Sequence, residues 1–147
     1  MPKQVLILNG PNLNRLGLRE PEVYGEDTLE AINDRIAAHA RARGLEAVFQ
    51  QSNHEGVLID HLHAAADSTI GVVFNPGGFT HTSVALRDAV ASIPVSVVEG
   101  HLSNIYARES FRHNSLISGA CRAVISGLGV QGYLAAIDYL ADLSPTP

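Results

Sequence analysis

Five strand-like runs separated by amphipathic stretches constrain the fold of this chain more than any other feature of its sequence. Two of the runs, Val5–Leu8 (VLIL) and Gly71–Phe74 (GVVF), are continuously apolar, which is typical of strands covered by helices on both faces. The other three runs are Glu46–Gln51, Val95–Val98 and Cys121–Ile125. Strands that alternate with helices predict an α/β fold: a doubly wound, five-stranded parallel sheet with helices on both faces and right-handed connections.

Helix signals fill the intervals between these runs. Asp27 or Thr28 can cap a helix that Gly44 ends, and capping-box spacing relates Asp27 to Glu30 and Ser52 to Glu55. Buried stripes at helical spacing identify three of the helices: Leu29, Ile32, Ile36 and Ala40; then Leu58, Ile59, Leu62, Ala65 and Ala66; and finally Val130, Tyr133, Leu134, Ile137 and Leu140.

Three further segments complete the expected order of elements. A turn at Asn75–Ser83 should precede a helix that runs through Ala91, and Pro94 should separate that helix from the next strand. A polar loop, Glu99–Asn104, should lead into a short helical stretch, Ile105–Arg112. We expect the chain to fray from about Asp142 onwards.

Length and composition predict one catalytic domain over residues 1–147 in a cytoplasmic globular protein. The net charge is −5 and no basic stripe is present, so nucleic acid and acidic membranes are poor candidates for partners. The low charged fraction, 17%, beside 46% hydrophobic residues suggests that other subunits cover part of the surface. The single cysteine, Cys121, suits a reducing compartment. No apolar stretch approaches the length of a membrane span.

The long loop Asn9–Gly25 follows the first strand and is predicted to be an active-site loop. It is longer than ordinary strand–helix connections and carries polar side chains that could bind a ligand: Asn12, Asn14, Arg15, Arg19, Glu20 and Tyr24. The alternative is a surface lid with incidental polar residues. In a parallel sheet, this loop meets Asn75–Ser83 and Glu99–Asn104 at the carboxyl edge of the strands, where ligands of such folds bind.

Two histidines at the carboxyl edge are candidates for the functional site. Glu99 and His101 are two residues apart at a strand exit, so their side chains can share a side, where the carboxylate could orient the imidazole. The alternative is a structural histidine. His81 also lies at this edge, whereas surface positions are expected for His39, His61, His63 and His113. His61 and His63 would face different sides of a helix, and no metal-binding spacing is present, so we predict no metal site.

The segment Gly127–Gly132 (GLGVQG) matches the dinucleotide fingerprint but fails in its context. The fingerprint should open the first βαβ unit and precede an acidic ribose-binding residue, whereas this copy precedes the last helix. A tight turn is the better interpretation. Without a nucleophile elbow or a Walker loop, the chemistry falls to Tyr, His, Asn and Arg, which indicates proton transfer on a polar, anionic small molecule with no obligatory cofactor.

Five motifs resemble those of type II 3-dehydroquinate dehydratases: NGPNLNRLGLREPEVYG, QSNHEGVLID, NPGGFTHTSVALRDA, VEGHLSN and RESFRHNS. The resemblance implies a flavodoxin-like fold, a homododecamer built from trimers, and reversible dehydration of 3-dehydroquinate to 3-dehydroshikimate. That reaction belongs to the shikimate route or to quinate breakdown. The sequence departs from the pattern at Gly78-Phe79, where Ala-Tyr is frequent, and at Gly100, where a branched residue is common.

The resemblance also implies catalytic roles. Tyr24 resembles the family's base, which takes a proton from the carbon next to the ketone, and Arg19 would lower the pKa of this tyrosine and lie near the enolate. Asn12 would hold a water that stabilises the enolate. His101 would protonate the departing hydroxyl, with Glu99 orienting the imidazole.

Substrate-binding roles follow in the same way. Ring hydroxyls and the carboxylate would be bound by the side chains of Asn75, His81 and Arg112 and by the backbone amides of Leu102 and Ser103. Asp88 would reach the site of a neighbouring subunit, and Arg108 would support the loop. Two other functions stay open from the sequence: a flavin- or nucleotide-binding module of the same fold, and a catalytically silent scaffold.

Overall fold

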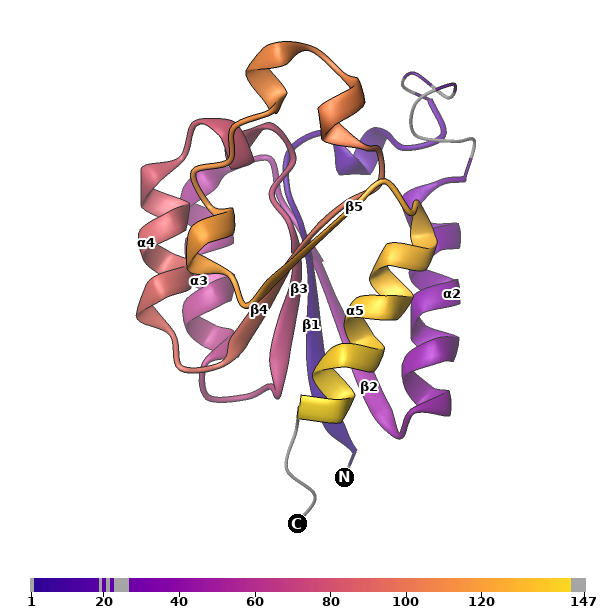
Figure 1. The fold of residues 1–147 in the computed structure, drawn as a ribbon. Coiled ribbons are helices and arrows are strands. Elements are labelled where there is room, and N and C mark those ends of the chain that lie inside the picture. Colours follow the sequence, from indigo (N-terminus) through magenta and orange to yellow (C-terminus); the bar gives the residue numbers. More distant parts are fainter. Residues whose placement is uncertain (1, 19, 21, 23–26, 144–147) are drawn as a thin grey trace.

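The computed structural model, which describes residues 2–18, 20, 22 and 27–143, contains a parallel five-stranded sheet. Its order is β2-β1-β3-β4-β5, the order of flavodoxin-like folds, and every neighbouring pair is parallel (Figure 1). The strands are β1 (Lys3–Asn9), β2 (Leu45–Gln51), β3 (Gly71–Asn75), β4 (Ser96–His101) and β5 (Ala123–Ser126). The predicted doubly wound sheet is confirmed.

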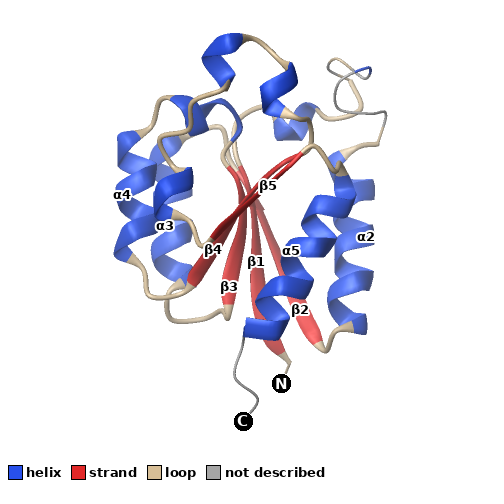
Figure 2. Ribbon diagram, viewed as in Figure 1, coloured by secondary structure: helices blue, strands red, loops and turns tan. Residues whose placement is uncertain are grey.

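Two pairs of helices cover the two faces of this sheet (Figure 2). The helices are α2 (Leu29–Ala42), α3 (Glu55–Ala65), α4 (Val84–Ser92) and α5 (Val130–Leu143). Val5 and Ile7 of β1 pack in the core with α2 and α5, while Leu6 and Leu8 pack in the core with α3 and α4. Because successive residues point to opposite buried faces, the strand is apolar throughout.

Several boundaries differ from the sequence-based expectations. Strand β5 begins at Ala123 instead of Cys121, and the other strands differ by one to three residues at their ends. Strand β4 continues through Glu99 to His101, where we expected a loop, because Glu99 and His101 stay in register with Val124 and Ser126 of β5. The expected helical stretch Ile105–Arg112 is two 3₁₀ turns, Ile105–Ala107 and Ser110–Arg112, separated by extended backbone at Arg108. Helix α5 extends through Asp142 to Leu143, where we expected fraying to begin, and the Asp142 carboxylate accepts a hydrogen bond from Arg43 Nη2 at 2.7 Å. The rest of the expected frayed tail, residues 144–147, lies outside the described residues.

Only part of the expected capping is present. Thr28 caps α2, because its hydroxyl accepts a hydrogen bond from the backbone N–H of Ala31. The capping box expected at Ser52 is wrong: His54 is the residue that precedes α3, and the Ser52 hydroxyl accepts from the N–H of His54. Glu55 instead accepts a hydrogen bond from the hydroxyl of Ser83, which caps α4, so these side chains join the starts of α3 and α4.

The ends of β1 and β3 meet at the topological switch point, where the chain changes direction across the sheet. The N–H of Gly10 donates to the carbonyl of Asn75 at 2.7 Å. A Cβ at Gly10 would lie 2.5 Å from the carbonyl oxygen of Pro76, so only glycine allows this approach. The loops that leave β1 and β3 are therefore held side by side at the carboxyl edge of the sheet.

Within the described residues, none of the helices is both long enough and apolar enough to cross a membrane.

Candidate active site

A cavity of about 160 Å³ opens at the carboxyl edge of the sheet. It brings together the three predicted loop segments and the 3₁₀ turns that follow β4. Of the predicted site residues, the following line it: Asn12, Asn75, His81, His101, Leu102, Ser103, Arg108 and Arg112. Glu99 lies behind His101, and Asp88 is exposed on α4 away from the cavity lining. Arg19 and Tyr24 lie outside the described residues.

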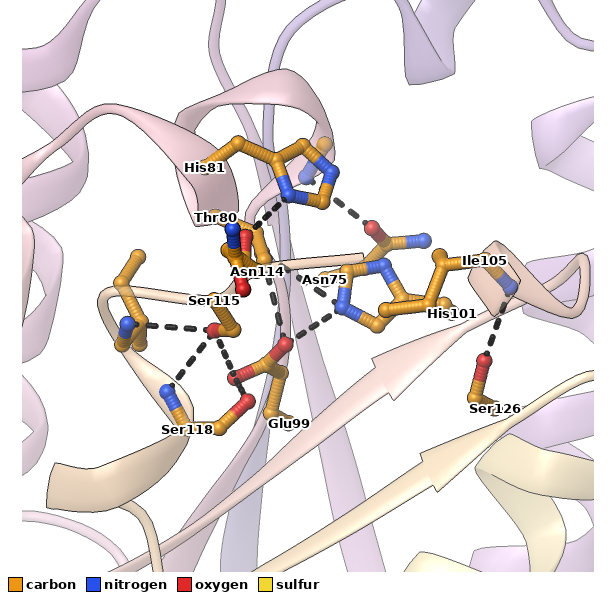
Figure 3. A network of polar contacts seen from close by, with 12 residues as sticks. Asn75, Thr80, His81, Glu99, His101, Ile105, Asn114, Ser115, Ser118 and Ser126 are labelled. Atoms are coloured by element: carbon orange, nitrogen blue, oxygen red, sulfur yellow. Dashed lines mark hydrogen bonds and ion pairs between the residues drawn. The ribbon is translucent and has the colours of Figure 1, made fainter. Parts of the chain in front are cut away.

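Glu99 and His101 form the predicted pair (Figure 3). Since they are two residues apart in β4, their side chains leave the same face of the strand, and Oε2 of Glu99 lies 2.5 Å from Nε2 of His101. Glu99 is fully buried and His101 is 9% exposed. The other ring nitrogen of His101, Nδ1, points away from Glu99 (Figure 3). The carboxylate therefore fixes the ring while leaving Nδ1 available to a ligand.

Hydroxyl groups that the sequence analysis missed surround the buried carboxylate of Glu99. Ser118 donates to Oε1 at 2.7 Å, and Ser115 lies 3.5 Å from the same oxygen. Thr80 lies 3.4 Å from both Oε2 of Glu99 and Nε2 of His101. A buried carboxylate is stable only when such donors replace its water, so these hydroxyls provide Glu99 with hydrogen-bond partners in the core.

Two cavity residues are held by the segment that follows β4. Nδ1 of His81 lies 2.7 Å from the carbonyl oxygen of Asn114, and because a carbonyl only accepts, Nδ1 carries the hydrogen. Nε of Arg112 donates to Glu109 at 2.9 Å, and this hydrogen bond lowers the pKa of the Glu109 carboxyl. Glu109 thereby holds Arg112 at the cavity edge.

The described part of the long loop is tied to β2 and to the 3₁₀ turns. Asn53 accepts a hydrogen bond from the N–H of Asn12, and Gln51 donates to the carbonyl of Gly10. Between the two 3₁₀ turns, Arg108 forms an ion pair with Glu20 across 3.6 Å. The motif containing Gln51 and Asn53 was recognised in the sequence, but these anchoring contacts were not foreseen.

The glycines that mimic a dinucleotide fingerprint make a turn, as predicted. Gly127 and Gly129 have positive φ angles, +94° and +59°, which glycine adopts without strain. Their N–H groups donate to the carbonyls of His101 and Leu102, so these donors stabilise the strand end instead of a phosphate. The hydroxyl of Ser126 donates to the carbonyl of Ser103 at 3.1 Å. The Leu102–Ser103 backbone is thus fixed where both residues line the cavity.

The remaining histidines and the cysteine take no part in the cavity. His39 is half-buried and contacts Asp138 of α5 at 2.8 Å, while His63 and His113 are exposed. Among the described residues, no three His, Cys, Asp or Glu side chains are grouped as metal ligands. Burial, with a smaller contribution from Glu99, raises the pKa of the Cys121 thiol to about 12, so this thiol is not ionised at neutral pH.

The two departures from the family pattern leave open space. A Cβ added at Gly78 or at Gly100 would meet no atom within 4 Å. Neither glycine is therefore required for a close backbone approach, and the surrounding site is formed without the larger side chains.

Fold and cavity together define a flavodoxin-like α/β protein whose site combines an oriented imidazole with two arginines, Arg108 and Arg112. Imidazole can transfer a proton and guanidinium can bind a carboxylate, so the cavity suits acid–base chemistry on a small anion.

Comparison with known proteins identifies the family. The family described as class II dehydroquinase matches residues 3–141. A 3-dehydroquinate dehydratase of Corynebacterium glutamicum is 57% identical, covering 97% of this chain and 99% of the relative. One of Ruegeria pomeroyi is 56% identical, covering 96% and 95%. The crystal structure of the type II dehydroquinase from Propionibacterium acnes is 42% identical, covers 97% of this chain and 98% of its own, and superposes with a TM-score of 0.93. The chain belongs to the class II dehydroquinase family, the hydro-lyases known as type II 3-dehydroquinate dehydratases.

Proposed function

We propose that this type II dehydroquinase of the shikimate pathway removes water from 3-dehydroquinate through an enolate, with Tyr24 as base and His101 as acid. The observation that carries the proposal is the buried Glu99–His101 pair on a cavity that also holds Arg108 and Arg112. In the first step the base takes the proton from the carbon next to the ketone, and the electron pair of the C–H bond moves onto the ketone oxygen. In the second step the enolate collapses, the C–O bond of the hydroxyl breaks, and the acid supplies the proton that makes the leaving group water.

His101 suits the second step. Its Nε2 is occupied by Glu99, so Nδ1 is the nitrogen from which a proton can pass to the leaving hydroxyl. A buried carboxylate beside the ring also stabilises the charged imidazolium relative to the same ring without a partner. Besides His101, three hydroxyls contact Glu99, those of Thr80, Ser115 and Ser118. They hold the carboxylate in place when the proton leaves His101.

Tyr24 and Arg19 are proposed for the first step from the motif REPEVYG alone. A guanidinium near a phenol stabilises the phenolate, which lowers the pKa of the tyrosine and makes it a base near neutral pH. Asn12, which lines the cavity, would hold the water that stabilises the enolate.

Substrate binding is proposed for other residues that line the cavity. Arg112 would pair with the substrate carboxylate together with the backbone amides of Leu102 and Ser103, and Asn75 and His81 would bind ring hydroxyls. Arg108 would support the loop through Glu20. We place the reaction in the cytoplasm.

The first prediction separates this mechanism from dehydration through a lysine Schiff base. Lys3 is the single lysine of the sequence and begins β1, at the edge of the sheet opposite the cavity. Purified protein should convert 3-dehydroquinate to a conjugated enone, followed by ultraviolet absorbance, at the same rate after treatment with borohydride plus substrate. Loss of activity with a substrate-derived mass on Lys3 would refute the enolate mechanism, and absence of any enone would refute the proposed function.

The second prediction concerns assembly. We propose a homododecamer of trimers in which Asp88, exposed on α4, contributes to the site of a neighbouring subunit. Asp88→Asn should lower both kcat/KM and the fraction of large assembly, since a carboxylate supplied across an interface can hold a guanidinium or a bound water. Light scattering coupled to size-exclusion chromatography would measure the mass, with exposed Asp34→Asn on α2 as the control. A fully active monomer would exclude the trans role.

A further inference from the structure

Tyr133 connects the last helix to the switch point of the sheet. It lies in α5 and is 4% exposed. Its hydroxyl donates to Oδ1 of Asn9 at 2.6 Å and accepts from Nδ2 of Asn75 at 3.1 Å. Asn9 and Asn75 are the last residues of β1 and β3 and face each other in the register of the sheet. One phenol therefore contacts both strand ends from which the two cavity loops depart.

The directions of these hydrogen bonds fix the amide of Asn75. Its Oδ1 accepts from the N–H of Gly77 at 3.1 Å, and because a backbone N–H only donates, this contact assigns the oxygen. Nδ2 must then face Tyr133. A phenol has one hydrogen, and Tyr133 gives it to Asn9, so its oxygen is left to accept from Asn75. Burial raises the pKa of Tyr133 to about 12, so the hydroxyl keeps its hydrogen at neutral pH.

This arrangement has a functional consequence for the second hydrogen on Nδ2 of Asn75. The bond to Tyr133 uses one of the two hydrogens on Nδ2, and Asn75 lines the cavity. An amide with both its oxygen and one hydrogen occupied presents its remaining N–H in a single orientation. We propose that Tyr133 is a positioning residue: it holds the Asn75 amide so that this remaining N–H is presented to a hydroxyl or carbonyl oxygen of the substrate. The inference rests on the proposed role of Asn75 in substrate binding.

Removing the hydroxyl tests the inference with little change to the core. In Tyr133→Phe the ring keeps its packing among the apolar residues between α5 and the sheet, while Asn75 loses one of two constraints. We expect kcat/KM for 3-dehydroquinate to fall about tenfold, mostly through KM, because a misoriented hydrogen bond to substrate is worth roughly this factor. Tyr139→Phe is the matched control, since Tyr139 lies on the same helix and its hydroxyl accepts from Arg122 away from the cavity. It should leave kcat/KM unchanged.

A double-mutant cycle distinguishes positioning from a general structural effect. Tyr133→Phe is combined with Asn75→Ala, and with Asn75→Ser in case the alanine variant folds poorly, and kcat and KM are measured for each protein. If Tyr133 acts through Asn75, its tenfold effect should shrink to less than about twofold once the amide is absent.

The outcomes separate cleanly. An equal loss in both backgrounds, or no loss in Tyr133→Phe, would overturn the inference. The proposed function would still stand, provided that the parent protein is active. A parent protein without turnover would overturn both. If Asn75→Ala itself has normal kcat/KM, Asn75 has no substrate contact to position, and the inference fails on that ground alone.

Discussion

Replacing Tyr24 with phenylalanine is expected to lower kcat about a thousandfold or more while KM changes little. The substitution removes one oxygen, and that oxygen is the proposed base; a positioned base contributes about 10²–10⁴-fold to a proton transfer. The proposed substrate contacts come from other segments, such as Arg112, which lines the cavity, so binding should persist. Steady-state kinetics of enone formation measure both constants, and Tyr139→Phe again serves as the control. A variant that keeps a tenth of parental kcat would show that Tyr24 is not the base.

The pH dependence of kcat would test what makes Tyr24 basic in the proposed mechanism. A free tyrosine has a pKa of about 10, so roughly one molecule in a thousand is ionised at pH 7. Bringing the pKa near 7 requires about 4 kcal/mol of preferential stabilisation of the phenolate, of which one nearby guanidinium can supply a large part. Activity rises as the base loses its proton, so Arg19→Ala should move the inflection of kcat to higher pH. Exposed Arg41→Ala is the control. Profiles that differ in height but share one inflection would exclude Arg19 from this role.

The architecture could be predicted because its signals are local. A continuously apolar strand such as Gly71–Phe74 indicates that both faces of the sheet are covered. The apolar stripes at helical spacing identify the helices that cover them. The boundaries of the elements depend on partners far along the chain, so the boundaries were predicted less well. Nothing local marks Glu99 and His101 as strand residues; their pairing with β5 makes them so. The ion pair of Asp142 with Arg43, 99 residues earlier, has no signal in the local sequence, so the sequence predicted fraying at Asp142.

The candidate site was also predicted in part: contacts set by local spacing were predicted, and contacts from distant segments were not. The two-residue spacing of Glu99 and His101 at the end of a strand predicted that their side chains could share a side, and they are in contact. Ser115 and Ser118 were missed: they reach Glu99 from a segment of bends and 3₁₀ turns with no periodicity to interpret. Tyr133 was assigned to a buried stripe, and its ring does pack there, but the partners of its hydroxyl come from the ends of two strands. A buried tyrosine in an apolar stripe is therefore a signal worth following, since its hydroxyl usually needs a partner.

Replacing His101 with asparagine is expected to lower kcat by about a hundredfold or more, yet to leave proton abstraction intact. Asparagine cannot deliver a proton in place of Nδ1, so the departing hydroxyl leaves without its acid. If enolate formation comes first, the variant should still exchange the proton next to the ketone for deuterium in heavy water, which nuclear magnetic resonance of the substrate detects. Tyr24→Phe should lose this exchange. The pair of variants therefore assigns base and acid to separate steps.

Glu99→Gln refines this assignment, because it replaces the buried carboxylate with a neutral amide of the same shape. Ser118 can still donate to the amide oxygen, so the fold should persist, but the stabilisation of a charged imidazole is lost. We expect kcat to fall about tenfold to a hundredfold with exchange retained. His39→Asn, at the contact between α2 and α5, controls for loss of a histidine far from the cavity. If His101→Asn abolishes exchange as completely as Tyr24→Phe does, His101 is required for proton abstraction, and the assignment of acid and base must be revised.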